Sequence, residues 1–229
     1  MSTVTAPRPR PRRARVPPDP QRLLLYSVPW DSYEQILEAL DDRHLRITYD
    51  HGALEIMTLS PEHERNKILF RRLIEELCDT FDLAVAGLGS TTYRRREHER
   101  GLEPDECYYF GRLDRIRGLK RIDLRVDPPP ELVLEIDVTR SCIDRMEIYA
   151  SIGVKEVWTF DGDTLQMFRL NPHGEYELAT TSELFPGIPL GELVRFVKQG
   201  WDEEDTSMIR AFRAWLRKLQ AKRKRTGRR

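Results

Sequence analysis

The chain has 229 residues, which fits one mid-sized domain with tails or two very small domains. A hydrophobic share of 39% with 9% aromatic residues is enough for a folded core and excludes a wholly disordered chain. The longest apolar runs fall far short of the roughly 20 residues that span a bilayer, and no charged start precedes an apolar h-region. We therefore expect a cytoplasmic protein without a membrane segment. Its three cysteines lack CxxC spacing and predict neither a disulfide framework nor a zinc ribbon.

The formal net charge of zero hides two strongly basic ends. Residues 1–20 contain five Arg, one Asp and six Pro, so we expect an extended arm with a charge of +4 there. Residues 217–229 carry +8 and no acidic residue, which leaves about −12 on the rest of the chain. Basic ends of this kind fit contact with a polyanion, and solvated termini of an arginine-rich protein fit equally well.

The first third of the chain predicts a helix, a hairpin and a second helix. Apolar residues at helical spacing predict the first helix within residues 23–40. Residues 45–49 and 53–59 have the pattern of two strands around the turn Asp50-His51-Gly52. Ser60 as N-cap, with Pro61 at the first helical position, opens a helix that continues to residue 81.

The rest of the chain is richer in predicted strands. We expect them over residues 83–93, 104–110, 132–139, 156–160, 165–170 and 176–181. A charged loop is predicted over residues 94–100, a short helix over 142–152, and a helical region from residue 192 into the basic tail. This order of elements predicts one α/β domain with a mixed sheet.

The strand predicted over residues 132–139 carries two acidic side chains on one face. Side chains alternate across a strand, so apolar residues fill one face while Glu135 and Asp137 lie on the other, about 7 Å apart. Burying such a pair requires a compensating positive charge. A divalent metal ion, or Arg140 or Arg145 from the next helix, could provide it. A strand face open to water is the alternative.

A second source of carboxylate is Asp105, at the start of the strand predicted over residues 104–110. Alone it is a weak signal, but the strand with Glu135 follows about 30 residues later, and a helix comes next. A hard cation such as Mg²⁺ prefers carboxylate, water and phosphate oxygens. Such an ion can activate water and neutralise charge on a phosphate under attack. Asp105 and Glu135 are therefore candidate metal ligands.

The first turn of the helix that opens at Ser60 offers two further candidates, Glu62 and His63. Glu62 borders the apolar stripe of this helix and His63 lies on the edge of the same stripe, so either side chain could reach the carboxylates. An acidic residue in a first turn also suits the helix dipole, so capping is the alternative for Glu62.

Three blocks of the sequence resemble the Uma family of restriction endonucleases, within the PD-(D/E)XK nuclease superfamily: GLEPDECYYF, PPELVLEID and IYASIGVKEVW. The resemblance covers residues 33–196. It implies a restriction-endonuclease-like α/β fold over residues 21–200, a central mixed sheet flanked by helices, followed by a C-terminal helix with a basic tail over 201–229. It also implies hydrolysis of DNA with Mg²⁺, or Mn²⁺, held by Asp105 and Glu135, with Glu62 as an optional third ligand.

One position departs from the motif of that superfamily. Asp137 stands where the motif has a lysine that orients the attacking water and stabilises negative charge. Asp137 could instead be a further metal ligand. Related families place the basic residue on the following helix, where Arg145 lies four residues before Tyr149. An arginine stays charged, so it can stabilise an oxyanion but is a poor base.

Three functions stay open at this stage. The first is an Mg²⁺-dependent endonuclease, with the basic ends and Arg94, Arg95 and Arg96 in contact with DNA phosphates; those arginines could also form a solvated loop. The second is a degenerate nuclease fold that binds nucleic acid or a partner protein without cutting, which Asp137 favours. The third is a small-molecule phosphodiesterase. The sequence does not separate DNA from RNA. Because nucleases that cut both strands are often dimers, a homodimer through the helix ending at Leu219 is a candidate assembly.

Overall fold

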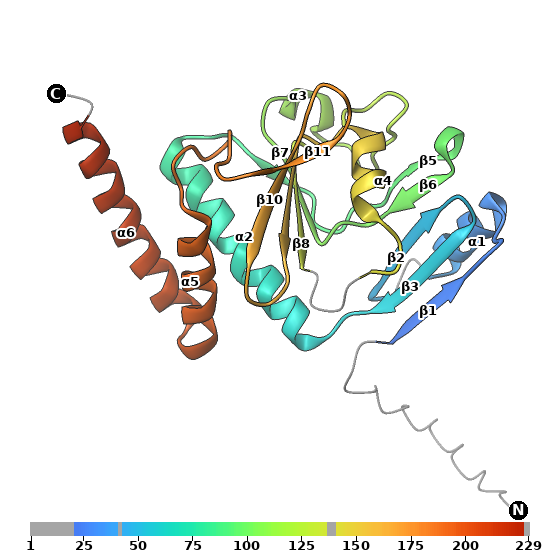
Figure 1. Cartoon of the computed structure of the whole chain (residues 1–229), viewed down its shortest axis with the longest axis horizontal. Helices are drawn as coiled ribbons and strands as arrows, with labels where there is room; N and C mark the ends of the chain where they lie inside the picture. The colour runs from blue at the N-terminus through green and yellow to red at the C-terminus, as the bar shows by residue number, and fades with distance from the viewer. Residues whose placement is uncertain (1–20, 41–42, 137–140, 227–229) are drawn as a thin grey trace, which may run out of the picture.

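The structure is a computed structural model that describes residues 21–40, 43–136 and 141–226. The arm predicted over residues 1–20 and the predicted site residue Asp137 lie outside this part of the chain. The described residues form two β-sheets with helices packed on them (Figure 1). The predicted α/β class with a mixed sheet flanked by helices is confirmed, but the strands divide between two sheets, where the sequence predicted one.

The five-stranded sheet is antiparallel. Its strands lie in the order β1 (Arg22–Leu25), β3 (Ala53–Thr58), β2 (Leu45–Asp50), β6 (Arg100–Leu102) and β5 (Tyr93–Arg95). Helix α1 (Trp30–Leu40) covers one face and buries Trp30 and Tyr33 against Tyr49. The predicted hairpin of β2 and β3 is confirmed, with φ angles of 45° at His51 and 87° at Gly52 in its turn.

The six-stranded sheet is mixed. Its strands lie in the order β11 (Tyr176–Ala179), β10 (Leu165–Leu170), β9 (Glu156–Phe160), β8 (Leu132–Ile136), β7 (Glu106–Tyr109) and β4 (Ala86–Gly87). Strands β8 and β9 are parallel, and helix α4 (Arg145–Ile152) lies between them in the chain. The other pairs in this sheet are antiparallel.

Three long helices lie on one side of the six-stranded sheet, and the last of them packs against the other two (Figure 1). Helix α2 (Pro61–Phe81) begins where Ser60 Oγ accepts a hydrogen bond from the His63 amide at 3.1 Å. Its apolar stripe packs on the sheet, and α5 (Leu190–Asp202) and α6 (Asp205–Thr226) pack beside it. Helix α4 covers the opposite face. In the described part of the chain no helix is long and apolar enough to cross a membrane.

Three predicted elements differ from the structure, and one strand was not predicted. Residues 83–93 do not form one strand but contain β4 and the first residue of β5, because Gly89, with φ 60°, turns the chain between them. Residues 94–100, which were predicted as a loop, contain most of β5, the 3₁₀ helix η1 (Arg96–His98) and the start of β6. The short helix α3 (Leu113–Ile116) follows β7. The first helix lies within its predicted range, but strand β1 before it was not predicted. The last helical region divides into α5 and α6.

Candidate active site

Two adjacent strands of the six-stranded sheet bring Asp105 and Glu135 together. Asp105 directly precedes β7, which pairs antiparallel with β8 with Glu106 opposite Leu134, so the register places Asp105 beside Glu135. Asp105 Oδ2 accepts a hydrogen bond from the amide of Ile136 at 2.6 Å. The two acidic residues are only 2% and 4% exposed. The structure therefore brings together the two carboxylates that the sequence analysis named as candidate metal ligands. Because both are buried, their negative charges are costly unless positive groups lie beside them.

Arg46 of β2 provides one compensating charge. Its Nη2 atom forms an ion pair with Asp105 Oδ1 and lies 3.4 Å from Glu135 Oε2. Arg46 is 5% exposed, so this contact is shielded from water. One guanidinium group from the five-stranded sheet thus contacts both carboxylates of the six-stranded sheet.

Arg145, the first residue of α4, provides the second charge. Its Nε and Nη2 donate to Glu135 Oε1 at 3.2 and 2.6 Å, Nη1 donates to the hydroxyl of Thr48, and Nη2 also donates to the carbonyl oxygen of Glu103 at 2.7 Å. Tyr149, one turn along α4, donates its hydroxyl to the same Glu135 Oε1. Burial by itself would raise the pKa of Glu135, but Arg145 and then Arg46 outweigh it and lower that pKa. Glu135 is therefore ionised in the folded protein.

His63 completes the cluster from the first turn of α2. Its Nε2 lies 3.0 Å from Asp105 Oδ2 and 2.9 Å from Arg46 Nη2. Burial, followed by the charge of Arg46, lowers the pKa of His63 to about 4, so the imidazole is neutral near pH 7. A neutral imidazole beside a carboxylate is a competent metal ligand.

The donor set fits a divalent cation in its chemistry. Glu135 Oε2 is buried and has no hydrogen-bond partner in the described structure, although it faces Arg46. Two carboxylates suit a hard cation, and the nitrogen of His63 suits Mn²⁺ better than Mg²⁺. Among the described residues no group of three His, Cys, Asp or Glu side chains is already arranged as a metal site. The metal-ligating atoms of the cluster belong to Asp105, Glu135 and His63, and Arg46 lies beside the oxygens of the two carboxylates.

A strand of the five-stranded sheet secures the segment that follows the undescribed residues 137–140. Glu55 of β3 is fully buried and accepts hydrogen bonds from Ser141 Oγ at 2.6 Å and from the amide of Cys142 at 2.8 Å. Arg22 lies 3.4 Å from the same carboxylate. Strand β3 therefore holds the chain at Ser141 and Cys142, the first described residues after β8.

The other predicted site residues lie elsewhere. Glu62 is exposed on the first turn of α2, whereas its neighbour His63 is the buried side chain that contacts Asp105. The predicted phosphate contacts are engaged within the protein. Arg94 and Arg96 pair with Glu34, Arg96 also pairs with Asp31, and Arg95 donates to the carbonyl oxygens of Ser151 and Leu124.

The sequence analysis did not identify Arg46 and Thr48 as site residues. A signal was present, because Arg46 and Thr48 alternate with the apolar residues of a predicted strand and so share its other face. The sequence pattern alone predicts that this face is exposed to solvent. In the structure β8 and α4 cover it, with Arg46 at 5% and Thr48 at 1% exposure.

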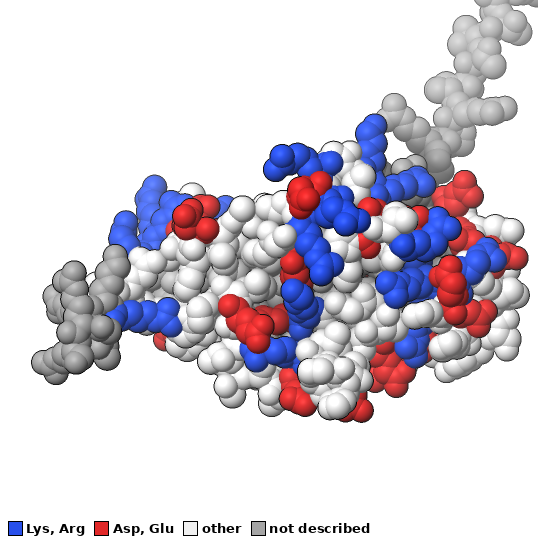
Figure 2. Space-filling view, turned by 90° about the horizontal axis from the view of Figure 1, so that it is seen from above, with Lys and Arg blue, Asp and Glu red and all other residues white. Residues whose placement is uncertain are grey.

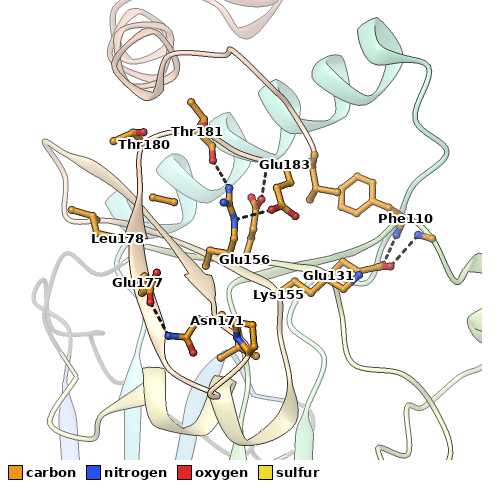
Figure 3. A pocket seen from close by; sticks show the side chains of 16 residues that line it. Phe110, Glu131, Lys155, Glu156, Asn171, Glu177, Leu178, Thr180, Thr181 and Glu183 are labelled. Carbon is orange, nitrogen blue, oxygen red and sulfur yellow. Dashed lines mark hydrogen bonds and ion pairs between the residues drawn. The ribbon is translucent and has the colours of Figure 1, made fainter.

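A separate pocket of about 920 Å³ lies beside β10 and β11 (Figure 3). Its charged groups serve local structure. Glu131 accepts hydrogen bonds from the amides of Phe110 and Gly111, and Glu156 accepts one from the amide of Glu183 (Figure 3). Neither Asp105 nor Glu135 lines it. The pocket is therefore distinct from the carboxylate cluster.

Comparisons with known proteins give one family match. The model of the Uma2 family, described as "Putative restriction endonuclease", matches residues 30–197. A solved structure of "a putative nuclease belonging to DUF820 from Anabaena variabilis" is similar, with 13% sequence identity and a TM-score of 0.47, over 66% of this chain and 90% of that one. None of the curated proteins matches.

Proposed function

Since this chain belongs to the Uma2 family, described as "Putative restriction endonuclease", we propose that it is a metal-dependent endonuclease that hydrolyses phosphodiester bonds in DNA. The observation that carries this proposal is the buried meeting of Asp105 and Glu135 from adjacent strands, with arginines on both sides. A pair of buried carboxylates is costly to a fold, and it is typical of sites where binding or chemistry requires the charge.

Asp105 and Glu135 would hold Mg²⁺ or Mn²⁺, with His63 as a third ligand for Mn²⁺. When bound, such an ion supplies an activated water and neutralises charge on the attacked phosphate. Arg145 and Tyr149 keep Glu135 ionised and oriented through Oε1, and the amide of Ile136 orients Asp105 through Oδ2. The predicted assistance of Asp137 stays a prediction, as does a contribution from the exposed Glu62.

A basic surface near α3 supports a nucleic-acid substrate. The segment 112–125 carries six exposed cations and two acidic residues, and it lies on the face where Lys and Arg side chains spread among acidic ones (Figure 2). The cations are Arg112, Arg115, Arg117, Lys120, Arg121 and Arg125. Arg125 pairs with Asp123 and Arg115 donates to a carbonyl group, whereas the other four have no ion pair within the described residues. This segment is thus better placed than Arg94, Arg95 and Arg96 to bind phosphates.

The test is cleavage of plasmid and single-stranded DNA by the full chain with Mg²⁺ or Mn²⁺, beside Asp105→Ala and Glu135→Ala. Nicking that requires metal and is absent from both variants supports the proposal. RNA cleaved in place of DNA corrects the substrate, and sedimentation of the active protein tests the proposed homodimer. A wild type as inert as its variants contradicts the nuclease.

A degenerate nuclease fold is the second candidate, because Arg46 and Arg145 neutralise the carboxylates without any ion. The exchange Asp137→Lys separates the two functions. A gain of cleavage in this variant indicates a decayed site, and a loss of cleavage identifies Asp137 as a working ligand of an active enzyme.

A further inference from the structure

The four carboxylate oxygens of the cluster divide into two pairs. Glu135 Oε1 receives Arg145 and Tyr149, and Asp105 Oδ2 receives the amide of Ile136, so these two oxygens hold the side chains in place. The other two, Asp105 Oδ1 and Glu135 Oε2, both face Arg46 Nη2. The two carboxylate oxygens that could bind a metal ion, Asp105 Oδ1 and Glu135 Oε2, are thus the two beside Arg46.

Arg145 is committed to structure by its contacts. All three of its nitrogen atoms donate to groups of the protein: the carboxylate of Glu135, the hydroxyls of Thr48 and Tyr149, and the carbonyl oxygen of Glu103. A guanidinium group held on so many sides has little freedom to follow a phosphate through a reaction. Arg145 is therefore a positioning residue that acts through Glu135.

We propose that Arg46, from a strand far from the motif in sequence, is the catalytic cation that replaces the motif lysine. The inference rests on the proposed nuclease function. In hydrolysis, water adds to phosphorus, the bond from phosphorus to the leaving sugar oxygen breaks, and the protons of the water pass to that oxygen and to solvent. Arg46 neither gains nor loses a proton. Its fixed charge stabilises the negative charge that develops on the phosphate oxygens.

This placement gives Arg46 two opposing effects. It contacts Oδ1 of Asp105 and Oε2 of Glu135, the oxygens that a divalent ion also requires, so ion and guanidinium compete for them. Removing Arg46 therefore slows cleavage while strengthening metal binding. Removing a metal ligand weakens both. An arginine that only neutralised the carboxylates would also strengthen metal binding when removed, but would leave the rate of cleavage at saturating Mn²⁺ unchanged.

The experiment compares wild type, Arg46→Met and Arg46→Lys as full chains, by calorimetric titration with Mn²⁺ alone and by single-turnover cleavage of a DNA duplex. Arg46→Met is expected to bind Mn²⁺ at least threefold more tightly and to cleave at least 100-fold more slowly, which is about the effect of losing one charge-stabilising donor. Arg46→Lys, which keeps the charge, should recover at least tenfold of that loss. Circular dichroism verifies that each variant is folded.

Arg100→Met is the matched control, because Arg100 lies on β6 of the same sheet as Arg46 and pairs with Asp50 of β2 and Glu147 of α4. It should change neither quantity by more than twofold. Cleavage by Arg46→Met within threefold of wild type overturns the inference, and so does weakened Mn²⁺ binding in that variant. If Arg46→Met does not fold, Arg46→Lys decides, since full loss of activity in a folded lysine variant also overturns it. An inert wild type overturns the nuclease and the catalytic role together, and the titration still tests whether Arg46 shares the oxygens of the ion.

Discussion

Arg145 and Tyr149, one turn apart on α4, donate to the same oxygen atom, Oε1 of Glu135. The tyrosine hydroxyl is buried with the carboxylate, and hydrogen bonds to charged groups contribute about 1.5–3 kcal/mol. We expect Tyr149→Phe to lower the free energy of unfolding by about that amount in urea titrations. Tyr176→Phe, which removes only a bond to the carbonyl oxygen of Val154, should cost about 1 kcal/mol. Equal losses of unfolding free energy in the two variants would contradict an extra contribution from the bond between Tyr149 and the ionised Glu135.

The buried imidazole of His63 makes stability depend on pH. Its pKa is about 4 in the folded protein against an ordinary 6.5, so between these values the unfolded chain binds a proton here that the folded protein does not. Stability supplied by this residue is thus complete above pH 6.5 and is lost as the pH falls to 4. In EDTA, the unfolding free energy of wild type should fall more steeply over this range than that of His63→Gln. Parallel pH profiles would contradict the prediction.

The basic segment after β7 should control the salt dependence of DNA binding. Removing one cation that binds a phosphate flattens the slope of log K against log salt by about 0.9 for duplex DNA. Binding of the variant Arg117→Ala/Lys120→Ala/Arg121→Ala, measured by fluorescence anisotropy in EDTA, should give a slope flatter by up to about 2.7. Arg96→Ala is the control, because Arg96 is already paired with Asp31. A larger change in slope from Arg96→Ala than from the triple variant would contradict this prediction and support DNA binding by Arg94, Arg95 and Arg96.

Gly101 on β6 lies against the buried ring of Tyr33. A Cβ atom at residue 101 would come within 2.9 Å of Tyr33 Cζ and still closer to its hydroxyl. Gly101→Ala should therefore cost about 1–3 kcal/mol by overpacking. The hydroxyl of Tyr33 has no hydrogen-bond partner in the described structure, so Tyr33→Phe should cost little and should relieve part of the clash. A double-mutant cycle in urea with no coupling between the two changes would contradict this packing.

The position of Glu135 was predictable because strand alternation is a strict rule. Glu135 lies on the face opposite Leu134 and Ile136, and the register of β7 and β8, which alternation does not give, places Asp105 beside it. The helix that carries His63 was less decisive. Glu62 and His63 both border the apolar stripe, and a small rotation of the helix about its axis determines which of the two side chains is buried.

Arg46 could not be assigned to the site because it is separated from Glu135 by long stretches of chain. Alternation identifies its face but does not say what covers that face, and the answer depends on how two sheets pack together. Because the sequence predicted a single sheet, it did not indicate that a residue of one sheet contacts the carboxylates of another. The irregular region 83–100 was missed for a related reason, since its short strands are fixed by pairing with distant partners such as β2 and β7.

The links between the two sheets have a mechanical consequence. Arg46, Thr48 and Glu55 of the five-stranded sheet contact Asp105, Arg145 and the chain at Cys142, so the carboxylate cluster also connects the two sheets. An ion bound to the oxygens that face Arg46 would weaken one of these contacts. We therefore expect metal binding to weaken the contact between the sheets, and amide exchange along β2 should become faster when an ion binds.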